Sequence, residues 1–148
     1  SDPTVEIGPL LTQGRVKEMQ KRVQKAVKEG AQILCGGSSP GGELKRGSFF
    51  EPTVLGDVSP SMEVCGASLT GPVLSLVTVD SFEEGIHVLN DGPVLPAASL
   101  FTRSMERTHR TLRELSAHSI SVNQPPTVGG NPKDYLDSLT LTKHIALG

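Results

Sequence analysis

The stretch AASLFTRSMERTHRTLRELSAHSISVN, residues 97–123, decides the fold class of this chain. It begins with a short apolar run, continues with a polar segment that favours a helix, and ends with a second apolar run, SISVN. Two apolar strands joined by a helix are the pattern of a βαβ unit with parallel strands. The strands are apolar rather than alternating, as expected where both faces of a sheet are covered.

Upstream, residues 12–30 predict the clearest helix of the chain. Thr12 can cap its start, and Gly30 suits a left-handed stop. Apolar residues recur at helical spacing, with basic and amide side chains between them: Val16, Met19, Val23, Ala26 and Val27. This helix should cover one face of a neighbouring element.

Further strands and a second helix are predicted between these two regions. Residues 31–37 predict a short buried strand, and residues 49–58 and 71–79 predict two more. Residues 81–91 predict a helix that is capped by Ser81 and that buries one apolar face, made by Phe82, Ile86 and Leu89. We therefore predict an α/β fold with a mainly parallel sheet and flanking helices.

The C-terminal part of the chain differs in pattern. Residues 124–135 form a Pro/Gly-rich loop, and residues 138–145, SLTLTKHI, alternate with period two, which indicates a half-exposed strand added to another sheet. Such an edge favours pairing with a second copy, so we expect a homo-oligomer that forms through this strand. The domains expected are residues 1–124 and a linker loop with an oligomerisation strand at 125–148.

Composition excludes several classes of protein. The formal charge of −2 over 148 residues, with four phenylalanines, one tyrosine and no tryptophan, argues against a nucleic-acid partner. The apolar runs are too short for a membrane span, and no secretory signal is visible. Two cysteines without metal or disulfide spacing favour a reduced, intracellular and cytoplasmic setting.

The segment VCGASLTGPVLSLV, residues 64–77, is the strongest candidate for a functional turn, yet it matches no general motif. A nucleophile elbow needs Gly-x-Ser-x-Gly between a strand and a following helix, whereas here the second glycine is one position late and the strand follows the serine. The P-loop ending and the Gly-x-Gly-x-x-Gly dinucleotide fingerprint are also missing.

The isolated ionisable residues predict no catalytic group and no metal site. Glu83 and Glu84 are adjacent, so they point to different sides of a helix. Cys65 lies among small residues with no histidine near it in the sequence, so we interpret it as unreactive. The four histidines show no metal-ligand spacing: His87, His109, His118 and His144.

Taken in order, these pieces resemble the aldehyde dehydrogenase family. Residues 2–37 resemble the segment that follows the family's catalytic cysteine, and FFEPTVLGDVSPSMEV, residues 49–64, resembles its Pro-Thr-Val-Leu strand. Residues 71–91 and 97–123 resemble the two strand–helix segments after it, and LTLTKHI, residues 139–145, resembles the closing strand. Five motifs in the family's order, over nearly the whole chain, identify the chain as a member.

The resemblance implies NAD or NADP in the parent protein and points to the positions that would touch it. Family members carry Glu-x-Phe before Gly-Pro-Val; the glutamate resembles a clamp on the nicotinamide ribose, and the phenylalanine packs beside the nicotinamide. Those positions here hold Ser68 and Thr70. A neutral hydroxyl cannot replace a carboxylate that accepts from both ribose hydroxyls, so cofactor positioning should weaken by about 1.5–3 kcal/mol.

The resemblance also implies what this chain lacks. Residues 124–130 correspond to the wall of the family's substrate tunnel, which makes Thr127 and Val128 candidate pocket residues. The family's nucleophile, general base and Rossmann domain would lie upstream of this chain, and neither Cys35 nor Cys65 occupies the nucleophile's position. We therefore expect no cofactor on this chain alone.

The leading hypothesis is the C-terminal portion of an NAD(P)-dependent aldehyde dehydrogenase-like protein. It would be inactive alone and would have two partners, the rest of its parent chain and further copies. The parent would be a degenerate, non-catalytic member that acts in assembly. One alternative is a fragment of an active enzyme that oxidises an aldehyde to a carboxylic acid. Another is a related protein that reduces acyl phosphates or acyl-CoA. The substrate and the choice between NAD and NADP stay open.

Overall fold

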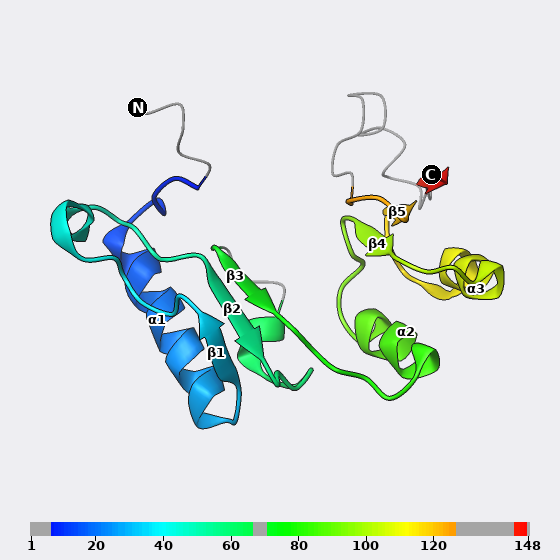
Figure 1. The fold of residues 1–148 in the computed structure, drawn as a ribbon, viewed down its shortest axis with the longest axis horizontal. Helices are drawn as coiled ribbons and strands as arrows, with labels where there is room; N and C mark the ends of the chain where they lie inside the picture. Colours follow the sequence, from blue (N-terminus) through cyan, green and yellow to red (C-terminus); the bar gives the residue numbers. More distant parts are fainter. Residues whose placement is uncertain (1–6, 67–70, 127–143, 148) are drawn as a thin grey trace. The chain divides into compact units, whose positions relative to one another are not determined.

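The structure is a computed structural model that describes residues 7–66, 71–126 and 144–147 (Figure 1). The chain divides into two compact units, Ser1–Thr78 (unit 1) and Val79–Gly148 (unit 2), and each is described by itself. Unit 1 contains α1 (Gln13–Lys28), β1 (Gln32–Cys35), the 3-10 helix η1 (Gly42–Arg46), β2 (Thr53–Gly56), the 3-10 helix η2 (Glu63–Cys65) and β3 (Val73–Ser75). Unit 2 contains α2 (Phe82–Asn90), β4 (Ala98–Leu100), α3 (Met105–Glu114), β5 (Ser119–Val122) and β6 (His144–Leu147).

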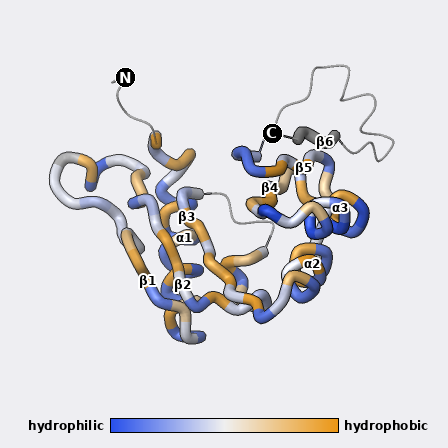
Figure 2. The backbone as a smooth tube through the Cα atoms, turned by 45° about the vertical axis from the view of Figure 1, so that its right-hand side comes forward, coloured by the Kyte–Doolittle hydropathy of each residue, from blue (hydrophilic) through white to orange (hydrophobic). Residues whose placement is uncertain are grey.

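Unit 1 is built on a three-stranded sheet in the order β1-β2-β3. Strands β2 and β3 are parallel, with Thr53 opposite Val73. Strand β1 runs antiparallel to β2, and its register shifts between Ile33 and Cys35, which is the signature of a β-bulge. Figure 2 shows apolar stretches along β1 and β2. This sheet is therefore mixed rather than wholly parallel.

Helix α1 covers one face of this sheet (Figure 1). The Thr12 hydroxyl caps its start by accepting a hydrogen bond from the backbone N–H of Arg15 (3.3 Å), and Gly30 follows its end with a φ of +114°. Both end signals were predicted, and so were four of the buried positions. Those four belong to a core that also includes residues of β2 and η2: Val16, Met19, Val23, Ala26, Leu55 and Val64. Val27, expected on the same face, is 41% exposed.

Unit 2 contains the predicted βαβ unit. Strands β4 and β5 are parallel, with Ser99 opposite Ser121, and α3 connects them. Strand β6 adds to β5, also in parallel, so the sheet order is β4-β5-β6. The buried apolar core of this unit consists of Ile86, Leu115, Ala117 and Ile120.

The two helices of unit 2 are fixed by local hydrogen bonds. The Ser81 hydroxyl accepts from the N–H of Glu84 (3.0 Å), and the Glu84 carboxylate accepts from the N–H of Asp80 (2.7 Å), which confirms the predicted cap of α2. Helix α3 buries two hydroxyls that bond its own backbone, Thr108 to the carbonyl of Ser104 and Thr111 to that of Arg107. Leu89, expected on the apolar face of α2, is 45% exposed.

One expectation about the strands is wrong. All four residues of β1 are exposed, although a buried strand was predicted, because β1 is the edge of its sheet and α1 packs over the centre. The described strands form two three-stranded sheets, one in each unit, and three of their four pairings are parallel, in agreement with the predicted mainly parallel arrangement. An apolar run predicts a strand, but it does not identify the neighbouring strand or its direction.

The C-terminal strand is only partly described. Strand β6, His144–Leu147, overlaps the end of the predicted strand at 138–145, and it pairs with β5 of the same chain, with Ser119 opposite His144. Its role in oligomerisation stays a prediction, as does the division into 1–124 and 125–148. Within the described ranges, the helices are too short or too polar to cross a lipid bilayer.

Candidate functional site

The first candidate region is the approach to β3, because the sequence places the cofactor-facing positions there. The short helix η2 lies directly before them and is anchored in the core of unit 1 by Met62 and Val64, which are 9% and 4% exposed. The hydroxyl of Ser75 on β3 also donates to the backbone carbonyl of Val64 (3.5 Å). The chain is thus held by packing up to the end of η2.

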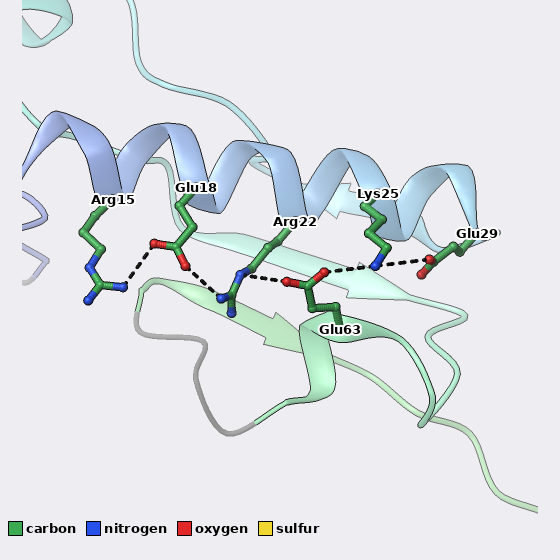
Figure 3. A network of polar contacts seen from close by, with 6 residues as sticks. All are labelled: Arg15, Glu18, Arg22, Lys25, Glu29 and Glu63. Atoms are coloured by element: carbon green, nitrogen blue, oxygen red, sulfur yellow. Dashed lines mark hydrogen bonds and ion pairs between the residues drawn. The ribbon is translucent and has the colours of Figure 1, made fainter.

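A chain of charged side chains fastens η2 to α1 (Figure 3). The carboxylate of Glu63 lies 3.0 Å from the Lys25 ammonium and 3.3 Å from Nε of Arg22. Arg22 also bonds Glu18 at 2.8 Å, which continues the network along the helix. The hydrogen bond from Lys25 lowers the pKa of Glu63 and raises that of Lys25 in return. Glu63 and Lys25 therefore remain charged together over the neutral pH range.

The far end of the same approach is fixed by close packing. A side chain at Gly71 would overlap the terminal methyl of Met19, a residue of α1 that is 3% exposed. The next residue, Pro72, accepts a hydrogen bond from the N–H of Thr53 (2.8 Å), and this bond starts the β2–β3 ladder. Ser68 and Thr70 lie outside the described residues, so their proposed contact with a cofactor stays a prediction.

The described residues around this approach do not fit a nicotinamide ribose. The nearest carboxylate in the sequence, that of Glu63, already pairs with two cations of α1. Its oxygens are therefore engaged, and the flanking residues Gly66 and Gly71 carry no side chain that could accept from a sugar hydroxyl.

The two cysteines do not resemble activated nucleophiles. Partial burial raises the pKa of the Cys65 thiol, and its Sγ lies 3.7 Å from the carbonyl of Ser59, an acceptor that favours the neutral thiol. Cys35 lies exposed on β1, and its Sγ is also 3.7 Å from a carbonyl, that of Pro52. The described residues include no group of histidine, cysteine and acidic side chains that could hold a metal ion.

The second candidate region is the carboxyl end of β4 and β5 in unit 2. Asn123 follows β5 with a φ of +56°, and its side-chain oxygen accepts from the N–H of Thr102 (2.9 Å) while its Nδ2 donates to the Thr102 carbonyl (3.0 Å). The amide of Asn123 thus takes the place of a backbone peptide and extends the ladder by one step. The hydroxyl of Ser99 then holds the next carbonyl, that of Gln124 (2.8 Å).

This second region leads into the loop predicted to line the substrate tunnel. Thr127 and Val128 lie outside the described residues, and their role stays a prediction. The ligand-binding edge of a parallel sheet is generally the carboxyl end of its strands, which is where Asn123 and Gln124 lie. From the sequence, Asn123 was recognised only as the last residue of a predicted strand. An asparagine directly after a strand is a signal for the left-handed conformation seen here.

A further charged cluster on α2 and α3 was not predicted. The Arg110 guanidinium pairs with Glu83 and with Glu114, and it lies 5.2 Å from the centre of the Phe82 ring. The bonds from Arg110 lower the pKa of both carboxyls. Because Glu83 pairs with Arg110 while Glu84 caps α2, the two glutamates act separately, as their adjacency predicted. This cluster joins two helices.

These features define first a class of protein. Short strands joined by helices, with a polar loop that leaves the carboxyl ends of a parallel pair, are the architecture of α/β proteins that bind ligands at that edge. A family model described as the aldehyde dehydrogenase family matches residues 1–133. The chain belongs to the aldehyde dehydrogenase family, as the sequence motifs predicted.

Several relatives agree with this assignment. The chain is 37% identical over 126 residues to a chloroplastic betaine aldehyde dehydrogenase of Beta vulgaris, which covers 83% of this chain and 25% of that protein. It is 39% identical over 124 residues to the 3,6-anhydro-alpha-L-galactose dehydrogenase of a Vibrio species, which covers 83% and 26%. The chain thus spans about a quarter of the length of these relatives.

Solved structures show the same fold. Betaine aldehyde dehydrogenase from Staphylococcus aureus, in complex with NAD+, superimposes with a TM-score of 0.73 at 28% identity, over 84% of this chain and 25% of that one. Lactaldehyde dehydrogenase from Escherichia coli gives a TM-score of 0.75, also at 28% identity, over 83% and 25%. The α/β arrangement of this chain is therefore the one found in the matching part of each of these two enzymes, which is about a quarter of the enzyme's chain.

Proposed function

We propose that this chain is the C-terminal part of the catalytic region of an NAD(P)-dependent aldehyde dehydrogenase-like protein, and that it is inactive by itself. The observation that carries the proposal is the family match over residues 1–133 in a chain that spans only a quarter of its relatives. The thiolate that attacks the aldehyde in this family would come from the rest of the parent polypeptide. The raised pKa of Cys65 supports this view, because a protonated thiol is a poor nucleophile.

A calorimetric titration tests the inactivity of the chain. We expect no saturable binding when NAD+ is added to the chain, and no turnover of betaine aldehyde, whereas the Staphylococcus aureus enzyme measured beside it should bind NAD+. Saturable binding in the micromolar range, or measurable turnover by the chain alone, would overturn the proposal.

We also propose that the parent is degenerate in its grip on the cofactor, because Ser68 and Thr70 stand where family members carry glutamate and phenylalanine. Restoring both, Ser68→Glu with Thr70→Phe, in the full-length parent should tighten cofactor binding about tenfold to a hundredfold, which corresponds to about 1.5–3 kcal/mol. Ser61→Glu is the matched control, because Ser61 is exposed and the substitution adds the same charge at another position. Equal cofactor affinities for the restored and parent proteins would contradict the proposal.

The alternative function is an active dehydrogenase, and the identities of 37% and 39% to named aldehyde and sugar dehydrogenases favour it. Finding a cysteine and a nucleotide-binding domain upstream in the full reading frame, with turnover of betaine aldehyde that a Cys→Ala variant abolishes, would establish it. If the parent instead reduces an acyl phosphate or acyl-CoA, the third hypothesis holds. A parent without any of these activities supports the non-catalytic assignment.

Assembly through the C-terminal strand is the last part of the proposal. Among the described strands, β6 lies at the edge of the β4-β5-β6 sheet, and an edge strand can pair with the same strand of another copy. Light scattering should show an oligomer that is lost when residues 137–148 are deleted. A strict monomer at high concentration, unaffected by that deletion, would exclude this mode of assembly.

A further inference from the structure

The approach to β3 contains a single charged residue, and that residue is directed at α1. Glu63 is the only acidic or basic residue between Asp57 and Asp80. Its carboxylate pairs with the Lys25 ammonium at 3.0 Å and with Nε of Arg22 at 3.3 Å (Figure 3). The one charge available in this part of the chain is therefore used to bind η2 to two successive turns of the helix.

These ion pairs add direction to a contact that packing alone would leave less defined. Met62 and Val64 bury η2 in the core of unit 1, but apolar burial is non-directional. The guanidinium of Arg22 also bonds Glu18 at 2.8 Å, and its side chain is 15% exposed. Connected charges of this kind hold a geometry better than a single exposed pair does. Glu63 therefore fixes where η2 lies along α1.

Helix α1 meets the other end of the same approach as well. A side chain added at Gly71 would overlap the terminal methyl of Met19, which is 3% exposed. Met19 and Arg22 are three residues apart, which corresponds to about 4.5 Å along the helix axis. The stretch that begins at Glu63 and ends at Gly71 thus leaves α1 and returns to it within about one turn.

We propose that Glu63 is a positioning residue for the cofactor-facing residues of the parent protein. By binding Arg22 and Lys25, it fixes the start of the stretch that carries positions 68 and 70, and the contact of Met19 with Gly71 fixes the end. The inference rests on the proposed function, which assigns the cofactor to these two positions. Glu63 itself makes no contact with the cofactor in this proposal, because both of its ion pairs are with α1.

A double-mutant cycle on NAD+ affinity in the full-length parent tests this role. With Glu63 present, Ser68→Glu with Thr70→Phe should tighten binding about tenfold to a hundredfold. With Glu63→Gln, that gain should be about threefold smaller, because the restored side chains then extend from a start that is less well fixed. In the parent that keeps Ser68 and Thr70, Glu63→Gln should change NAD+ affinity little.

Two further variants separate positioning from a merely structural role. Glu29→Gln removes the same charge from the same network, but the ion pair of Glu29, with Lys25 at 3.9 Å, lies within α1, so the full gain should remain. Glu63→Asp keeps the charge and should retain more of the gain than Glu63→Gln does. A residue that only stabilised the fold would lower NAD+ affinity by the same factor with and without the restored pair.

The outcomes distinguish this inference from the proposed function. An undiminished gain in the Glu63→Gln background would overturn the positioning role and leave the proposed function intact. Equal losses of the gain with Glu29→Gln and Glu63→Gln would also overturn it, since net charge would then be the cause. No gain from the restored pair while Glu63 is present would refute the proposed degenerate grip instead, and the positioning role with it.

A measurement on this chain tests the contact without a cofactor. Helix η2 is closed by hydrogen bonds from the N–H of Cys65 to the carbonyl of Met62 (3.0 Å) and from the N–H of Gly66 to that of Glu63 (3.1 Å). Glu63→Gln should speed hydrogen exchange at these two amides about threefold or more, while amides in the middle of α1 keep their rates. Unchanged exchange at both amides would show that the ion pairs do not hold η2, and would overturn the proposal.

Discussion

Units 1 and 2 bury their main helices by different means. Helix α1 contributes a stripe of four buried apolar residues to the core of unit 1. The buried residues within α3 are instead two threonines, Thr108 and Thr111, whose hydroxyls donate to backbone carbonyls one turn earlier. The apolar stripe gains free energy from removing surface from water, while a satisfied hydroxyl contributes little net stability. Two helices that look alike as ribbons are therefore held by different forces.

The sizes of the two cores follow the same division. Among the described residues, the core of unit 1 includes ten buried apolar side chains and that of unit 2 includes four. Because stability depends on the apolar surface buried, unit 1 should resist unfolding better than unit 2. The comparison can be tested one residue at a time.

The largest effect is expected from truncating the centre of each core. Leu55→Ala and Ile120→Ala each remove a side chain with 0% exposure, and each should cost about 2–5 kcal/mol of unfolding free energy. Hydrogen exchange should show lost amide protection mainly in the unit that carries the change, with unit 2 the more sensitive. Equal loss of protection in both units after either change would contradict this expectation.

A backbone test within unit 1 should have the next largest effect. Gly36 has a φ of +69°, and a side chain there would overlap the carbonyl oxygen of Pro52, so Gly36→Ala should destabilise unit 1 by about 1–3 kcal/mol in thermal melts. Gly41→Ala is the matched control: its φ is −84° and no atom lies within 4 Å of an added Cβ. We expect the control to be neutral or slightly stabilising; similar losses for both would refute the explanation.

A reciprocal exchange of hydroxyl and methyl sharpens the comparison of α1 with α3. Val23→Thr puts a hydroxyl into a fully apolar site and should cost about 1–3 kcal/mol. Thr111→Val removes a hydroxyl from a site that is 2% exposed and should change stability by less than about 1 kcal/mol. Urea titrations measure both, and equal costs would show that the two helices are buried in the same way after all.

The smallest effect is expected at the surface network of unit 1. The pKa of Glu63 is depressed from 4.5 and that of Lys25 is raised from 10.5, so their pairing stabilises the fold fully between those two pH values. Stability should fall as acid protonates Glu63 below pH 4.5 and as base neutralises Lys25 above pH 10.5. Glu63→Gln should reduce both slopes in melting temperature against pH. Unchanged slopes would show that the network contributes nothing.

The sequence predicted what is encoded locally. The caps at Thr12 and Ser81 and the left-handed Gly30 follow from residues within one turn, so each was found. The exposure and direction of β1 were not predicted, because they depend on β2, which lies beyond a long loop and is not marked as its partner by any local pattern.

The candidate site shows the same limit. Ser68 and Thr70 could be proposed only because neighbouring motifs align with a family, and their role stays a prediction. The ion pair between Glu63 and Arg22 joins residues that are far apart in the chain, and no motif near either residue indicates that they are in contact. Asn123 was included in a predicted strand, but its hydrogen bonds to Thr102 were not predicted. They depend on a positive φ that the sequence suggests only weakly.

The side-chain amide of Asn123 has a consequence for how this part of the protein can vary. Because it completes the last step of the sheet by itself, the β4–β5 pair is closed off before the loop begins. Insertions or deletions beyond Gln124, whose carbonyl Ser99 holds, would leave the hydrogen bonds of that pair in place. Evolution can then lengthen, shorten or rewrite the following segment without unfolding what precedes it, which is the freedom that a family of enzymes with many different aldehydes requires.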